Sequence, residues 1–185
     1  MAVTPDAAFL ARRSGDVNGD RARLLVVGDS RYEFSSTWHV NAAPDDVYAV
    51  LERLPDYPLW WPQVRTVTAL GNDSYELVCR SSLPYDLRFT TKQVVKSAAD
   101  RVLEASMSGD LEGFSRWTIS SDAHGTSAQF DEQVVATKPL LRKLELVARP
   151  AFKANHARMM RDGERGLSTY LAGYRARLNR PSAHD

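Results

Sequence analysis

One carboxylate interrupts a strand-like segment whose face is otherwise apolar. In residues 126–137 apolar and polar side chains alternate, and the period of two places Glu132 on the apolar face. The other members of this face are Ala128, Phe130, Val134 and Ala136. A buried carboxylate carries a large desolvation cost unless it is paired, and the same burial suits it to general acid or base catalysis. Glu132 is therefore a candidate catalytic residue; the alternatives are a structural ion pair with Arg116 or a strand whose two faces are assigned the wrong way round.

A second ionisable group lies on the apolar stripe of a long helical segment, residues 150–178. His156 is near the middle of this stripe, one turn before Met160. A neutral imidazole there would bind a ligand oxygen or relay a proton. The alternative is a core histidine that is satisfied by one backbone or side-chain partner. Glu132 and His156 together form the candidate acid–base pair.

The segment that carries His156 predicts an amphipathic helix with one buried face. At 100° per residue its stripe comprises Phe152, His156, Met159, Met160, Gly163, Leu167, Tyr170, Leu171, Tyr174 and Leu178. Such a helix is about 42 Å long and needs a broad apolar partner surface. A shorter helical stretch precedes it, and Pro150 predicts a kink or a break between the two.

The strand-like middle of the chain supplies that surface. Strict alternation predicts a first strand at Tyr32–Val40, and a short helix follows and ends near Pro55. The aromatic stretch Asp56–Val64 contains two prolines and cannot form one regular helix. Six further strands are predicted at Arg65–Leu70, Tyr75–Ser81, Tyr85–Lys96, Val102–Ser108, Leu111–Ser120 and Thr126–Thr137. Their short connections indicate an antiparallel meander, because parallel strands need crossovers.

Composition narrows the function classes. The 185 residues suggest one domain, residues 31–185, after a partly disordered extension at residues 1–30. The net charge of +1 argues against a nucleic-acid partner.

The single cysteine, Cys79, alternates with apolar residues and is interpreted as a small core residue. No zinc-binding spacing or nucleotide fingerprint occurs, so no metal or cofactor is predicted. No run is long enough for stable membrane insertion, which indicates a cytoplasmic protein.

Four groups of residues resemble a known family. They are Pro44–Tyr48, Tyr57–Val64, Gly109–Gly113 with Trp117 after it, and Asn155-His156 followed by Met160, Gly163, Glu164, Arg165 and Gly166. Their order and spacing resemble the START-like, or helix-grip, superfamily (SRPBCC, Bet v 1-like), and more narrowly its bacterial polyketide cyclase/dehydrase and lipid-transport group. The resemblance implies an α+β fold, in which a curved antiparallel sheet of about seven strands wraps around the long C-terminal helix. Two short helices would follow the first strand, and an apolar cavity would lie between sheet and helix.

The resemblance also implies a ligand and a set of residues that contact it. The expected partner is a lipophilic small molecule, a lipid, isoprenoid or polyketide, held by a carrier or binding protein that is a monomer or homodimer. The alternative is a cyclase/dehydrase enzyme that uses Glu132 and His156, and a protein-interaction module is a third class. The predicted ligand contacts are Trp38, Trp60, Trp61, Tyr85, Phe89, Gln93, Trp117, Phe130, Met160, Gly163 and Leu167. Gly163 has two readings, close packing against the sheet or the widest point of the cavity.

Overall fold

The computed structural model describes residues 31–80, 86–137 and 145–178. Its elements follow the order β1 (Arg31–Val40), α1 (Pro44–Glu52), η2 (Leu54–Asp56), α2 (Tyr57–Trp60), β2 (Val64–Gly71), β3 (Ser74–Arg80), β4 (Asp86–Ser97), β5 (Val102–Gly109), β6 (Leu111–Asp122), β7 (Gly125–Ala136) and α4 (Glu145–Leu178). This order confirms the predicted α+β class, with every predicted strand within two residues of an observed one.

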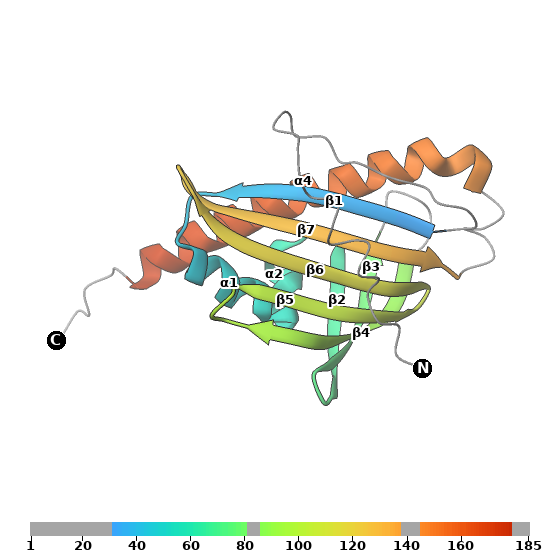
Figure 1. Ribbon diagram of the computed structural model, residues 1–185, viewed down its shortest axis with the longest axis horizontal. Coiled ribbons are helices and arrows are strands. Elements are labelled where there is room, and N and C mark those ends of the chain that lie inside the picture. Colours follow the sequence, from blue (N-terminus) through green and yellow to red (C-terminus); the bar gives the residue numbers. More distant parts are fainter. Residues whose placement is uncertain (1–30, 81–85, 138–144, 179–185) are drawn as a thin grey trace.

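The seven strands form one antiparallel sheet in the order β1-β7-β6-β5-β4-β3-β2. Consecutive strands from β2 to β7 are neighbours, as the short turns predicted, and β1 pairs with β7 along its whole length. Figure 1 shows β1, β7 and β6 running across the view, whereas β2 and β3 stand almost upright behind them. The sheet is therefore strongly curved. The long helix α4 runs behind β1 and β7, on the concave side (Figure 1).

Aromatic side chains fill one end of the space between the sheet and α4. Trp38 of β1 is 1% exposed, and its ring centroid lies 5.2 Å from that of Trp61 and 4.7 Å from that of Trp117. Trp60 meets Trp38 edge-on at 6.4 Å, a favourable geometry for aromatic rings. Leu167 of α4 is fully buried in the same cluster. These contacts fix the helix against this end of the sheet.

Two glycines of α4 allow that approach. A Cβ atom on Gly166 would lie 1.7 Å from the carbonyl oxygen of Trp60, and one on Gly163 would lie 2.7 Å from Trp61 Cε2 and 2.8 Å from Trp38 Cη2. Non-bonded carbon atoms pack at about 3.5–4.0 Å. Gly163 was expected either to pack closely against the sheet or to mark the widest point of the cavity. The structure shows close packing, and the contact is with tryptophan rings.

The helix does not break at Pro150, because α4 runs as one helix from Glu145 through Pro150 to Leu178; the kink that was the other expectation there stays a prediction. Proline has a φ angle that suits a helix, and its cost comes from one lost backbone hydrogen bond and a clash with the carbonyl four residues earlier. Pro150 lies in the second turn, so only the start of a long helix is affected. The bent segment between α1 and β2 is as predicted, since it folds into η2 and α2 as two short turns.

Candidate functional site

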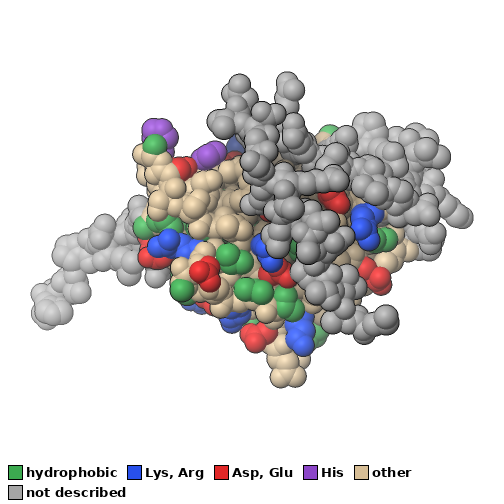
Figure 2. Space-filling view, in the orientation of Figure 1, with side chains coloured by type: hydrophobic (Ala, Val, Ile, Leu, Met, Phe, Trp, Pro, Cys, Tyr) green, Lys and Arg blue, Asp and Glu red, His purple; other side chains and the backbone are tan. Residues whose placement is uncertain are grey.

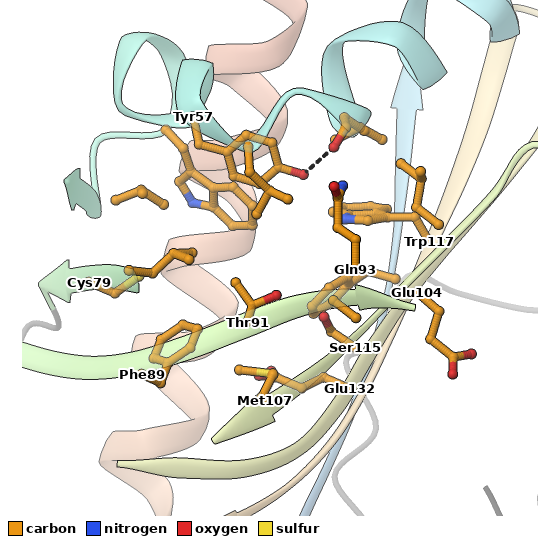
Figure 3. A pocket seen from close by; sticks show the side chains of 18 of the residues that line it. Tyr57, Cys79, Phe89, Thr91, Gln93, Glu104, Met107, Ser115, Trp117 and Glu132 are labelled. Atoms are coloured by element: carbon orange, nitrogen blue, oxygen red, sulfur yellow. Dashed lines mark hydrogen bonds between the residues drawn. The ribbon is translucent and has the colours of Figure 1, made fainter. Parts of the chain in front are cut away.

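A cavity lies between the concave face of the sheet, the segment from α1 to α2, and α4 (Figure 3). Its volume is about 110 Å³, counted as room for the centres of water molecules. One water needs roughly 10–15 Å³ by this measure, so the space holds more than an isolated solvent molecule. Most of its wall is apolar, and the polar side chains on it include Tyr57, Thr91, Gln93, Ser115 and Glu132.

One row of side chains crosses the floor of the cavity on four strands. Strand register aligns Glu132 of β7 with Ser115 of β6, Ser115 with Ala105 of β5, and Ala105 with Gln93 of β4. Residues opposite one another on neighbouring strands share a face, so all four belong to the concave side. Serine and alanine are small, which leaves space in the middle of the row. Glu132 and Gln93 stand at its two ends, and Figure 3 shows them well apart.

The structure brings the two predicted acid–base residues together. The Nε2 atom of His156 lies 3.6 Å from Oε2 of Glu132, and both side chains are about nine-tenths buried. The His156 ring stacks on Phe34, with centroids 3.9 Å apart and an interplanar angle of 12°. Within the described residues, neither nitrogen of the ring makes a hydrogen bond. Glu132 lines the cavity itself, whereas His156 lies beside it and fixes one side of the carboxylate.

The alternative ion pair between Glu132 and Arg116 does not form. Arg116 donates from Nε to Oε2 of Glu104 at 2.7 Å. The Glu104 side chain points away from the cavity in Figure 3, so this pair belongs to the opposite face of the sheet. Glu132 itself lies on the concave face, where it lines the cavity opposite Ser115; its catalytic role stays a prediction.

Two further titratable groups on the wall keep their protons at neutral pH. Burial raises the pKa of the Cys79 thiol to about 12, and the negative charges of Glu132 and Asp86 act in the same direction. Burial also raises the pKa of the Tyr57 phenol above its ordinary value of 10.0. The Tyr57 hydroxyl donates to the carbonyl oxygen of Leu51 at 2.7 Å. A protonated, buried thiol is a poor nucleophile, which agrees with the interpretation of Cys79 as a core residue.

The predicted ligand contacts divide into two groups. Trp61, Phe89, Gln93, Trp117 and Phe130 line the cavity. Five others lie in the packed layer and outside the lining, so their contact with a ligand stays a prediction: Trp38, Trp60, Met160, Gly163 and Leu167. The physical reason is that α4 presses directly on the tryptophan cluster at this end, so inward-facing side chains there touch other side chains. Tyr85 lies outside the described residues.

Several lining residues were not among the predicted ligand contacts. Ser115 and Ala105 are small residues on strands whose inner face could be named only after the strands were paired. Leu51, Leu54 and Met159 contribute from helices and turns. Strand register with Glu132 as the reference point would have found the first two.

The described part of the chain has neither a metal-ligand cluster nor a membrane-spanning helix. It contains no group of three or more histidine, cysteine, aspartate or glutamate side chains that could hold a metal ion. Within the same residues, no helix combines the length and apolar character that crossing a bilayer demands. On the face seen in Figure 2, the described basic and acidic side chains are interspersed, in keeping with a net charge of +1.

Comparison with known proteins supports the fold. A START superfamily protein from Mycobacterium smegmatis superimposes with a TM-score of 0.63 at 15% identity, covering 77% of this chain and 98% of that one. The Zhui aromatase/cyclase from Streptomyces sp. R1128 gives 0.61 at 18% identity, covering 84% and 98%. A norcoclaurine synthase from Thalictrum flavum gives 0.54 at 11% identity, covering 81% and 99%. At such identities the likeness concerns the fold alone.

Sequence comparison assigns the family. A search of curated proteins finds no match. The model of the family described as polyketide cyclase / dehydrase and lipid transport matches residues 31–171, which is most of the chain and the whole described sheet. The chain therefore belongs to the polyketide cyclase / dehydrase and lipid transport family.

Proposed function

We propose that the protein binds a lipophilic small molecule in the cavity between the sheet and α4, as a carrier or binding protein. The observation that carries this proposal is the apolar cavity above Ser115 and Ala105. Burial of apolar ligand surface would supply most of the affinity, and the few polar groups on the wall would set the orientation. The family description, which includes lipid transport, supports the same function.

A cavity-filling substitution tests the proposal. Ala105→Leu adds three carbon atoms to the middle of the floor, where the ligand would lie. Ser106→Leu makes a similar change on the next residue of β5, which is exposed on the opposite face. Binding of the uncharged apolar dye N-phenyl-1-naphthylamine is followed by its fluorescence. We expect Ala105→Leu to weaken binding at least tenfold, about 1.4 kcal/mol, and Ser106→Leu to bind as the wild type does.

Native mass spectrometry after incubation with a lipid and metabolite extract of the source cells identifies the natural ligand. A carrier releases the retained molecule unchanged. Failure of the dye to bind, or equal binding by both variants, would contradict the proposal and favour the protein-interaction module.

The juxtaposition of Glu132 and His156 favours a second candidate, an enzyme of the cyclase/dehydrase type. The cavity would hold a poly-β-carbonyl chain with its reacting carbon atoms close together. The Glu132 carboxylate would take the proton from a carbon atom between two carbonyl groups, and the enolate formed would attack a second carbonyl carbon. The alkoxide formed would take this proton back from the acid form of the pair and become a hydroxyl group. The carboxylate would then remove a second proton from the attacking carbon atom, and its transfer to the departing hydroxyl group would release water and leave a carbon–carbon double bond.

Variant kinetics separate the two candidates. For the enzyme, Glu132→Gln and His156→Ala abolish cyclisation of a poly-β-carbonyl thioester, while affinity for the dye stays within about tenfold, 1.4 kcal/mol. For a carrier, the wild type leaves the thioester to cyclise at its uncatalysed rate, and both substitutions change affinity or nothing.

A further inference from the structure

The described wall of the cavity carries acidic side chains and no lysine or arginine. Among the described residues that line it, none is lysine or arginine, and two are glutamates. Glu104 is neutralised by Arg116 and points away. Glu132 has His156 as the one basic side chain within 4.0 Å among the described residues. The cavity therefore contains a single carboxylate and no permanent positive charge on its described wall.

The contact between Glu132 and His156 does not satisfy the carboxylate. Their separation of 3.6 Å exceeds the 2.7–3.2 Å range of hydrogen bonds to nitrogen. The imidazole stacks on Phe34, with ring centroids 3.9 Å apart. In the described part of the chain no hydrogen bond reaches the Glu132 carboxylate, although its side chain is only 10% exposed. A buried carboxylate without donors is unfavourable, and a donor brought by a ligand would relieve that cost.

The field of this carboxylate extends across the cavity. Its charge contributes to the raised pKa of Cys79, which is on β3, four strands from β7 in the sheet order. A second negative charge placed in the same space would meet the same repulsion. The apolar floor at Ser115 and Ala105 begins directly beside Glu132, so a ligand can reach the carboxylate with a polar end while its apolar body covers the floor.

We propose that the ligand is an apolar molecule with a hydrogen-bond donor at one end, a hydroxyl or a protonated amine, that binds the Glu132 carboxylate. Lipids that end in a carboxylate or a phosphate are excluded by the same group. This inference rests on the proposed cavity binding, and it names the chemical class of the ligand.

Three compounds with the same ring body and different end groups test the inference. They are 2-naphthalenemethanol, 2-naphthalenemethylamine and 2-naphthoate, each used to displace N-phenyl-1-naphthylamine from the wild-type protein at about pH 7.5. We expect the alcohol and the ammonium compound to bind at least tenfold more tightly than the carboxylate. In Glu132→Gln the ratio should fall below about threefold, with a gain for naphthoate. Glu112→Gln removes the same charge from an exposed position of β6 and should keep the wild-type ratio.

The outcomes distinguish this inference about the ligand's end group from the proposal that the cavity binds a lipophilic molecule. Three outcomes would overturn the inference: equal affinities for all three compounds, tighter binding of naphthoate, or no displacement of the dye by any of them. They would do so even if the dye binds to the wild type and Ala105→Leu weakens dye binding. Absence of dye binding would overturn the cavity proposal as well. If thermal unfolding shows that Glu132→Gln does not fold, the wild-type protein alone tests the inference. The quantity that decides is then its ratio of affinities for the alcohol or ammonium compound and for naphthoate.

Discussion

Three glycines on α4 test how closely the helix packs against the tryptophans of the sheet and of the segment before β2, because the space around them differs. Gly166 meets the backbone of Trp60, Gly163 meets two tryptophan rings, and an added Cβ on Gly173, an exposed position, meets no atom of the rest of the described chain within 4 Å. Substitution by alanine adds one methyl group in each case and improves helix propensity by about 1 kcal/mol. Any difference among the three therefore measures the space around the helix.

The structure sets the order of the effects. Gly173 is exposed and its added methyl group meets no described side chain, so the gain in helix propensity should stabilise the alanine variant by about 0.5–1 kcal/mol. At Gly163 three ring atoms lie 2.7–2.9 Å from the new methyl group. These rings are fixed, since Trp61 donates a hydrogen bond to the carbonyl oxygen of Met159 at 3.0 Å and Trp38 is buried among other aromatics. Overpacking costs about 1–3 kcal/mol, and a value near the upper end leaves a net loss of about 2 kcal/mol.

Gly166→Ala should be the most harmful of the three. Its obstacle is a backbone carbonyl at 1.7 Å, which cannot rotate away, so α4 and the segment before β2 must separate. We expect a net loss of more than about 3 kcal/mol, a magnitude seen when a core contact is broken outright.

Urea unfolding followed by tryptophan fluorescence measures the series, because three of the four tryptophans, Trp38, Trp60 and Trp61, lie at these contacts. The midpoint should rise for Gly173→Ala and fall for Gly163→Ala and Gly166→Ala, with similar slopes. If Gly163→Ala were as stable as Gly173→Ala, the close contact between α4 and the tryptophans would be refuted. The packing account of Gly163 would fail with it.

Two further predictions concern the buried titratable groups. Burial raises the pKa of Tyr57 above 10.0, so the folded state holds this proton more tightly than the unfolded state does; the free energy of unfolding should be unaffected below about pH 9 and fall as pH rises past 10. Tyr57→Phe should lose this alkaline decrease in stability. At pH 7 the variant should be less stable than the wild type by about 1 kcal/mol, because the Leu51 carbonyl loses its donor. Urea titrations at about pH 8 and 11 would show both effects, and a decrease that persists in the variant would mean that another group causes it. Cys79, with a pKa of about 12, should resist 5,5′-dithiobis(2-nitrobenzoate) at pH 8 in the folded protein and react in urea, whereas rapid reaction in the native state would contradict its burial.

Local patterns were sufficient to predict the elements of the fold. Alternation of side chains located β1 to within one residue, and two prolines correctly excluded a regular helix between α1 and β2. The break expected as one outcome at Pro150 does not occur, because the local rule was applied without the position of the proline in the helix. A proline close to the start loses one hydrogen bond, while the rest of α4 keeps its packing against the sheet.

The site was harder to predict, because facing inward does not mean lining a cavity. Trp38 and Ser115 both face the concave side, yet Trp38 is packed beneath α4 and Ser115 lies on open floor. That difference depends on where the helix crosses the sheet, which sequence periodicity does not contain. Glu132 and His156 were found because each is an ionisable residue on an apolar face, and that signal is local.

The tryptophan cluster and the cavity are two results of one arrangement. Gly163 and Gly166 let α4 descend onto Trp38 and Trp60 at one end of the sheet. Trp61 packs against the helix there and also lines the cavity, so its indole marks the boundary between filled and open space. Beyond that boundary the floor includes the small side chains of Ser115 and Ala105. The room for a ligand is thus set by the glycine contacts as much as by the residues that face it, and a change at Gly163 should disturb binding through Trp61 without touching the floor.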